Sequence, residues 1–224
     1  MNWHGPRHGS RLSGVEVSLP TVQIEAVEQI EGLLATLRET PLRGFEAARP
    51  YASASLTLER LDPDDVMPPQ NYVLEPGIAT VLALREALAS WDVDPFALTG
   101  AVWVTADGER IPLLPPIVEQ SREPGGATVL LVADGMHRVY AARRLGLAIT
   151  CVVIRGVPAE YPYYAYALTG GWPAVTSFEE LPEGHQKKSY RRPLSYKALF
   201  RQFNVLYPGV QAQRRQTNPA HLQR

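Results

Sequence analysis

The sequence predicts an α/β (α+β) protein with a small mixed sheet, flanking helices and helical extensions at both ends. Residues 128–146 (TVLLVADGMHRVYAARRLG) begin with an apolar run that ends at Asp134-Gly135, and an amphipathic helical pattern follows at once. A second apolar run covers residues 149–154, directly after that helical pattern. A strand, a helix and a strand in immediate succession are typical of a sheet covered by helices.

Composition is that of a globular protein and excludes several classes. The chain has 224 residues, of which 45% are hydrophobic, enough to build a core. A single cysteine excludes a disulfide framework and fits the reducing cytoplasm, where we expect the protein to lie. No apolar run reaches the ~18 residues of a membrane span, so we expect no membrane partner. The formal net charge of −1 offers no overall attraction for DNA, which makes DNA an improbable partner.

The remaining elements follow from periodicity and from glycine and proline signals. Residues 22–37 carry Val22, Val27, Ile30, Leu34 and Leu37 at helical spacing between two prolines, which predicts a helix. Further elements are a strand at 54–61, a helix at 77–91, a strand at 101–105 that turns back into 109–113, and a helix at 196–204. These elements divide the chain into a disordered tail (1–18), an N-terminal helical extension (19–49), a core (50–158) and a C-terminal aromatic and basic extension (159–224), whose polar end we expect to be frayed.

The C-terminal extension opens with four tyrosines within residues 161–166. Such a cluster can line a ligand pocket or stack on a base, although core or interface packing accounts for it more often. Residues 187–192 (KKSYRR) form a local basic run. That run could hold nucleotide phosphates or nucleic acid, or it could be a solvated loop.

The turn at Asp134-Gly135 has the parts of an anion-binding site. The first N–H groups of a helix lack partners within the helix and lie at the positive end of its dipole. Gly135 permits a sharp turn, and His137 and Arg138 place two potentially cationic side chains in the first helical turn. Asp134 could cap the helix, hold a metal ion or orient a hydroxyl group. In the alternative interpretation Asp134 is only a cap, or Asp-Gly is a hairpin turn, and the cations are solvated.

DGMHRVYAARRLG (134–146) resembles the signature of the ParB/sulfiredoxin superfamily, DGHHR…A…LG in its small-molecule members. PPIVE (115–119) resembles the proline and strand that precede this signature, and LERLDP (58–63) resembles the opening strand and loop. The similarity covers about residues 54–158. It implies the small mixed sheet of that superfamily, with a nucleotide bound at the signature turn.

Individual residues discriminate among the members of the superfamily. Sulfiredoxins carry a catalytic cysteine where this chain has Met136, and the lone Cys151 lies in a predicted buried strand. ParB partition proteins bind CTP and continue into a helix-turn-helix domain, which residues 155–224 do not resemble. The free-serine kinases keep Asp, His and Arg as in Asp134, His137 and Arg138, and they are the closest match, although Met136 replaces their first histidine.

The resemblance therefore implies a nucleotide-dependent phosphotransferase that acts on a hydroxylated, amino-acid-like metabolite. In this scheme Asp134 and His137 are catalytic, and Asp64, Asp65 or Glu75 is the general base, with the two aspartates preferred. The expected nucleotide is ATP, ADP or CTP, and we expect Mg²⁺ to accompany it. The residues that would bind the metal are left open. The expected binding residues of the nucleotide are Pro116, Gly135, Met136, His137 and Arg138. The alternatives are a ParB-like nucleotide-binding regulator or DNA-associated clamp, and a simple nucleotide hydrolase; a homodimer is compatible with each.

Overall fold

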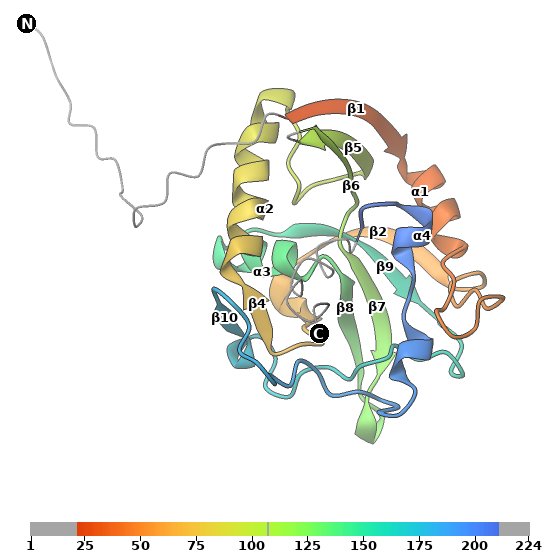
Figure 1. The fold of residues 1–224 in the computed structure, drawn as a ribbon. Helices are drawn as coiled ribbons and strands as arrows, with labels where there is room; N and C mark the ends of the chain where they lie inside the picture. Colours follow the sequence, from red (N-terminus) through yellow and green to blue (C-terminus); the bar gives the residue numbers. More distant parts are fainter. Residues whose placement is uncertain (1–21, 107, 211–224) are drawn as a thin grey trace, which may run out of the picture.

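The computed structural model describes residues 22–106 and 108–210 and has a mixed α/β fold (Figure 1). Within these residues the chain forms four α-helices, a five-stranded sheet, a three-stranded sheet and a two-stranded sheet. The predicted fold class is thereby confirmed. The tail expected at 1–18 and the polar end at 211–224 lie outside the described residues.

The five-stranded sheet contains the signature strand. Its strands lie in the order β2 (Ser55–Leu61), β9 (Ile149–Arg155), β7 (Ile117–Arg122), β8 (Thr128–Asp134) and β3 (Val66–Met67). Strand β7 runs antiparallel to β8 and parallel to β9, so the sheet is mixed, as predicted. The predicted strands at 54–61, 128–134 and 149–154 correspond to β2, β8 and β9.

Both faces of this sheet are buried, which explains the continuous apolar run in β9. Val152 and Ile154 point to one side, in a core cluster with residues of α1 (Ile30–Arg38) and α4 (Phe203–Leu206). Cys151 and Val153 point to the other side, in a cluster with residues of α2 (Glu75–Leu88) and α3 (Met136–Arg144). The sheet is thus the middle of three layers (Figure 1).

Two smaller sheets complete the described fold. The predicted hairpin forms β5 (Gly100–Ala106) and β6 (Glu109–Leu113), which are antiparallel. The short strands β4 (Tyr72–Leu74) and β10 (Thr176–Phe178) pair in parallel, directly before α2. Five 3₁₀ turns are described, and they are η1 (Pro63–Asp65), η2 (Ala89–Trp91), η3 (Pro124–Gly126), η4 (Trp172–Ala174) and η5 (Tyr196–Leu199).

The helix predicted at 22–37 is wrong in its first half. Residues Val22–Gln29 form strand β1, which pairs antiparallel with β5 along its length, and the helix begins only at Ile30. Val27, which the helical pattern placed on the buried face, is 57% exposed. The hairpin β5–β6 offers β1 a partner edge, and this long-range pairing outweighs the local helical spacing.

The helix predicted at 196–204 is also wrong as a continuous element. The chain forms the 3₁₀ turn η5, then an extended stretch, and then the short helix α4. Backbone groups in between pair with the loop after α1 instead: Arg43 N–H donates to the Phe200 carbonyl, and Gln202 N–H donates to the Pro41 carbonyl. The apolar side chains Leu199 and Phe203 are nevertheless buried.

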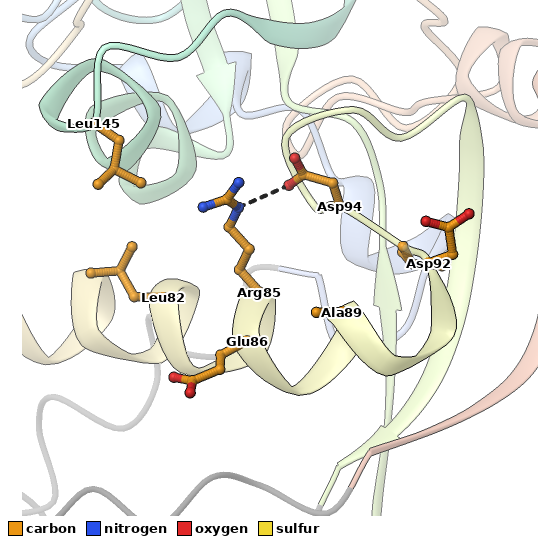
Figure 2. Close-up of a pocket in the computed structure, with 8 residues that line it drawn as sticks. Leu82, Arg85, Glu86, Ala89, Asp92, Asp94 and Leu145 are labelled. Carbon is orange, nitrogen blue, oxygen red and sulfur yellow. Dashed lines mark hydrogen bonds and ion pairs between the residues drawn. The ribbon is translucent and has the colours of Figure 1, made fainter. Parts of the chain in front are cut away.

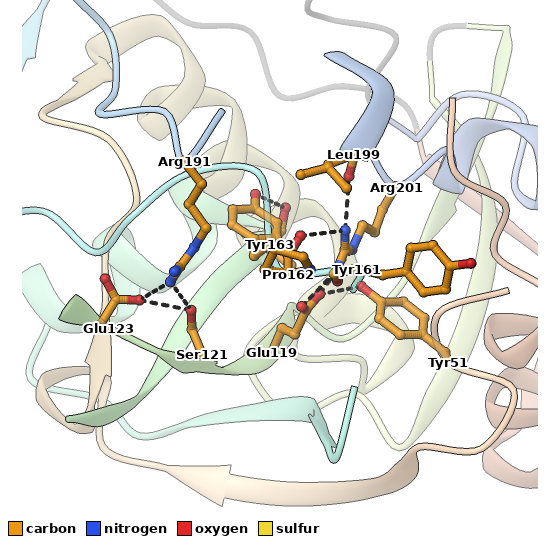
Figure 3. Close-up of polar contacts among 11 residues, drawn as sticks. Tyr51, Glu119, Ser121, Glu123, Tyr161, Pro162, Tyr163, Arg191, Leu199 and Arg201 are labelled. Atoms are coloured by element: carbon orange, nitrogen blue, oxygen red, sulfur yellow. Dashed lines mark hydrogen bonds and ion pairs between the residues drawn. The ribbon is translucent and has the colours of Figure 1, made fainter. Parts of the chain in front are cut away.

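A buried ion pair joins this C-terminal stretch to the centre of the sheet (Figure 3). The side chains of Glu119 on β7 and Arg201 are each 1% exposed, and Arg201 Nη2 and Nε donate to the two carboxylate oxygens at 2.7 and 3.1 Å. The Tyr51 hydroxyl donates to the same carboxylate at 2.8 Å. The remaining guanidinium donors reach the main-chain carbonyls of Tyr161, Pro162 and Leu199. Burial opposes the charge of Arg201, but the Glu119 carboxylate outweighs it and raises the arginine pKa.

The extension after residue 158 therefore packs into the same core as the sheet. Tyr163 and Tyr164 are 2% and 5% exposed, and the ring of Phe200 lies 4.5 Å from that of Tyr164. The interpretation of the tyrosine cluster as packing is confirmed for these two residues. Tyr163 also donates to the Ala133 carbonyl at 3.2 Å, one residue before Asp134.

We predict that Arg201→Met lowers the free energy of unfolding by about 3–5 kcal/mol, because the Glu119 carboxylate is left buried without its partner. The measurement is urea unfolding followed by circular dichroism. Arg155→Met is the matched control, because Arg155 and its partner Glu59 are 37% and 29% exposed and pairs of that kind contribute roughly 0–1 kcal/mol. Equal losses in the two variants would contradict the assigned importance of the buried pair.

Candidate functional site

The signature turn connects β8 to α3 at Gly135. Gly135 has φ 85°, a left-handed conformation, and it is the N-cap residue of α3. A Cβ atom at this position would lie 2.8 Å from the Pro116 Cβ atom, so the turn also packs tightly against Pro116. Glycine is thus required for two reasons, the backbone conformation and this close approach. Asp134, at the end of β8, pairs with Ile117 of β7 in the sheet.

His137 links the starts of two helices. The backbone N–H of Leu74, the N-cap residue of α2, donates to His137 Nε2 at 3.1 Å. His137 itself is the second residue of α3. The positive ends of the α2 and α3 dipoles therefore lie within the reach of one side chain, which favours an anion in this region.

Arg138 points into the protein. Its Nη1 atom donates to the Leu114 carbonyl, on the segment that leads into β7. Burial lowers the pKa of Arg138, and the nearby charge of Asp134 acts in the opposite direction. The preceding residue Met136 is half-buried and packs against the core cluster between the sheet and α2. The turn therefore holds one half-buried guanidinium close to one carboxylate.

The acidic candidates lie along α3, and arginines hold two of them. Arg143 Nε lies 2.5 Å from Asp64 Oδ1, and Arg144 Nη1 lies 3.2 Å from Glu75 Oε2. Glu75 is the first residue of α2, directly after the Leu74 amide that binds His137. The side chain of Glu75 is 31% exposed, whereas that of Asp64 is 64% exposed. Asp65 is exposed on the 3₁₀ turn η1. Of the three carboxylates, Glu75 is the one that directly follows Leu74, whose backbone N–H donates to His137 of α3.

The environment of Glu75 favours its charged form. A hydrogen bond from Ser177 on β10 is the largest cause that lowers the Glu75 pKa, burial raises the pKa, and Arg144 lowers it further. The folded carboxylate thus remains ionised below its ordinary pKa of 4.5. A site residue from the C-terminal extension, Ser177, therefore acts on a candidate base from the core.

Trp172 is a second contribution of the extension that sequence reasoning missed. Its indole Nε1 donates to the carbonyls of Pro63 and Val66, both at 2.8 Å, and its ring centroid lies 6.1 Å from that of Tyr140 on α3. Trp172 thereby fixes the loop of Asp64 and Asp65 relative to α3. The run Gly170-Gly171-Trp172-Pro173 was the available signal, but nothing in the sequence indicated its distant partners.

A surface groove of about 580 Å³ lies away from the signature turn (Figure 2). Leu82, Arg85 and Glu86 of α2 line it together with Ala89 of η2 and with Leu145, which directly follows α3. Arg85 contacts Asp94 across it at 3.2 Å. The groove lies at the C-terminal end of α3, whereas Asp134, His137 and Arg138 lie at or near its N-terminal end and do not line the groove.

The basic run at 187–192 is largely engaged with the protein itself. Arg191 Nη2 donates to Glu123 at 2.6 Å and to Ser121 at 2.8 Å (Figure 3). Lys188 Nζ donates to the Tyr164 hydroxyl. These contacts tie the run to the end of β7 and to the tyrosine cluster, so they explain these two cations without a nucleic-acid ligand.

A family model described as the ParB CE domain matches residues 32–176. The chain belongs to this family. The matched range contains the signature turn, α2 with Glu75, and Trp172, and it extends beyond the resemblance at 54–158 on both sides. The match supports the ParB-like family but not the finer assignment to the free-serine kinases. No curated protein and no solved structure matches the chain.

Neither a membrane-spanning helix nor a metal-binding cluster occurs among the described residues. Over 22–106 and 108–210, no helix combines the length and the apolar character needed to cross a bilayer. In the same part of the chain, no group of three or more His, Cys, Asp or Glu side chains is arranged to hold a metal ion.

We predict that Glu75 titrates below pH 4.5 in the folded protein and that Ser177→Ala raises its pKa more than Arg144→Gln does. Because the folded pKa is lowered, the stabilisation from this carboxylate is present above pH 4.5 and is lost as the pH falls through the folded pKa. Side-chain ¹³C NMR titration measures the shift, and Glu75→Gln assigns the resonance. A wild-type pKa of 4.5 or above would show that these contacts do not hold the charged form.

Proposed function

We propose that this ParB CE domain protein is a nucleotide-dependent phosphotransferase that phosphorylates a small hydroxylated metabolite. The observation that carries the proposal is the contact between the Leu74 amide and His137 Nε2, which brings the starts of α2 and α3 together. Glu75 stands beside this contact, and the charges of Asp134 and Arg138 lie in the turn. Phosphoryl transfer depends on positioning and charge neutralisation more than on covalent chemistry, and these are the properties the turn offers.

In the proposed scheme the nucleotide phosphates bind at the start of α3. Gly135, Met136 and His137 would hold them, and Arg138 would join them by exchanging its hydrogen bond to the Leu114 carbonyl for one to a phosphate oxygen. Pro116 packs against the turn. The nucleotide is ATP, ADP or CTP. Asp134 would orient the acceptor hydroxyl or contribute to a Mg²⁺ ion, which usually takes one or two protein carboxylates together with substrate phosphates.

Glu75 is our preferred general base, ahead of Asp64 and Asp65. It is less exposed than Asp64, and it begins the helix whose first amide binds His137. The lowered pKa makes Glu75 a weaker base than an ordinary glutamate, but it keeps the carboxylate ionised. An ionised carboxylate that accepts the hydroxyl proton late in the reaction is the arrangement that protein kinases also use.

A ParB-like nucleotide-binding regulator without transfer chemistry is the second candidate. Two observations favour it, namely that Asp64 and Glu75 are both held by arginines and that the family match extends no further than the ParB CE domain. A nucleotide hydrolase would use the same phosphate contacts with water as acceptor. We propose that DNA is not the main partner in either case, because Lys188 and Arg191 of the basic run bind protein groups.

We predict that Arg138→Lys weakens nucleotide binding by about 1.5–3 kcal/mol, the range for hydrogen bonds to charged groups, or roughly ten- to a hundredfold. Lysine keeps the charge but loses the planar fork that fits phosphate oxygens. Isothermal calorimetry with ATP, ADP and CTP, each with and without Mg²⁺, measures the affinity. Arg60→Lys, on the remote strand β2, is the control for the substitution itself. Wild-type protein that binds none of these nucleotides, or equal affinity of a folded Arg138→Lys variant, would remove the site assignment.

We predict that Glu75→Gln lowers kcat by roughly 10²–10⁴-fold, the usual contribution of a general base, while the nucleotide Kd changes little. Asp64→Asn and Asp65→Asn are matched isosteric controls with a smaller expected effect. Turnover is followed as nucleotide product released in the presence of a panel of hydroxylated acceptors, with water alone as the hydrolase arm. Nucleotide binding without turnover on any acceptor or on water would favour the regulator.

A further inference from the structure

Gly77 lies against the ring of His137. It is in the first turn of α2, and a Cβ atom at this position would lie 2.7 Å from His137 Nε2 and 2.8 Å from Cδ2. Distances this short do not occur between a real Cβ atom and its neighbours, so any larger residue would displace the imidazole. The described glycines with positive φ do not include Gly77, so its backbone conformation does not call for glycine.

Glycine at this helical position has a cost. Glycine loses more backbone freedom than alanine when a helix forms, and this loss reaches about 1 kcal/mol in the interior of a helix. The contact with His137 offers a reason for accepting that cost. With a Cβ atom at residue 77, the ring could not lie where the Leu74 amide donates to its Nε2 atom at 3.1 Å.

The same contact determines where the proton of the imidazole lies. A backbone N–H can only donate, so His137 Nε2 accepts and carries no proton in this arrangement. In a neutral imidazole the proton then lies on Nδ1. The Leu74 amide at the start of α2 thereby selects the Nδ1–H tautomer of His137, at the start of α3.

We infer that Gly77 is a positioning residue for His137: it leaves room for the ring at the start of α2, so that the Leu74 amide fixes the ring orientation and the Nδ1–H tautomer. The inference rests on the proposed function only in its last step, in which His137 acts on the nucleotide phosphates as an Nδ1–H donor. Gly77 itself does not touch the nucleotide in this scheme.

The chain offers a matched control in Gly32. It is the third residue of α1, as Gly77 is of α2, and a Cβ atom there would lie 3.1 Å from Glu28 Oε1, the far end of a longer side chain. Gly32→Ala therefore introduces the same methyl group into a helix without displacing a residue of the candidate site. Circular dichroism establishes that both alanine variants fold.

The tautomer of His137 is read directly from long-range ¹H–¹⁵N NMR spectra of the imidazole rings at about pH 8, above the ordinary histidine pKa of ~6.5. The chain has five histidines, and His137→Gln assigns the signal. We expect a protonated Nδ1 and an unprotonated Nε2 in the wild type and in Gly32→Ala, and loss of this pattern in Gly77→Ala. A protonated Nε2 in the wild type, or an unchanged pattern in Gly77→Ala, would overturn the inference. A protonated Nε2 in the wild-type spectrum overturns the inference even if Gly77→Ala does not fold.

Binding of ATP, ADP and CTP separates this inference from the proposed function. We expect Gly77→Ala and His137→Ala each to weaken binding roughly ten- to a hundredfold, and the double variant to bind as His137→Ala does, because the two changes remove one interaction. Additive losses would overturn the link between Gly77 and His137. Wild-type protein that binds no nucleotide would overturn the proposed function, and the tautomer spectra would still decide the role of Gly77.

Discussion

The arrangement of this protein depends on the buried ion pair between Glu119 and Arg201. Both charges lie in the apolar layer against the sheet, where an unpaired charge would be very costly. Arg201 makes five hydrogen bonds, which equals the number of its N–H groups, and three of them go to main-chain carbonyls. Any displacement of the C-terminal stretch would break several of these bonds at once. The pair therefore secures a segment with little regular secondary structure as firmly as a strand pairing would.

The candidate site combines two levels of organisation. The turn at Gly135 is local, because an apolar strand, a glycine and a helix follow one another in sequence. The surroundings of the turn are not local: His137 depends on Leu74, and the loop of Asp64 depends on Trp172. Local sequence thus creates the turn and the start of α3, whereas long-range contacts decide which carboxylate lies near them and which nitrogen of His137 accepts a hydrogen bond.

These two levels explain what could be predicted from the sequence. Strands β8 and β9 and helix α3 were predictable because their apolar runs have no other way to be buried. Strand β1 and the extended stretch around Arg201 were not, since each depends on hydrogen bonds to a distant segment that helical spacing does not reveal. The start of α2 was placed two residues late, although Pro76 in its first turn is a typical start signal. That shift left Glu75 outside the helix and concealed its place beside the Leu74 amide.

The extension after β9 belongs to the site as much as the superfamily core does. Arg201 holds the carbonyls of Tyr161 and Pro162, which begin the segment that leads to Trp172 and β10. Strand β10 pairs with β4 directly before α2, and its Ser177 bonds Glu75. The segment that carries Ser177 thus begins at carbonyls held by Arg201, on the opposite side of the sheet. This connection gives a physical reason for a family match that continues past β9 to residue 176. A chain cut after β9 would keep the signature turn and the arginines that hold Asp64 and Glu75, but it would lose Trp172 and Ser177.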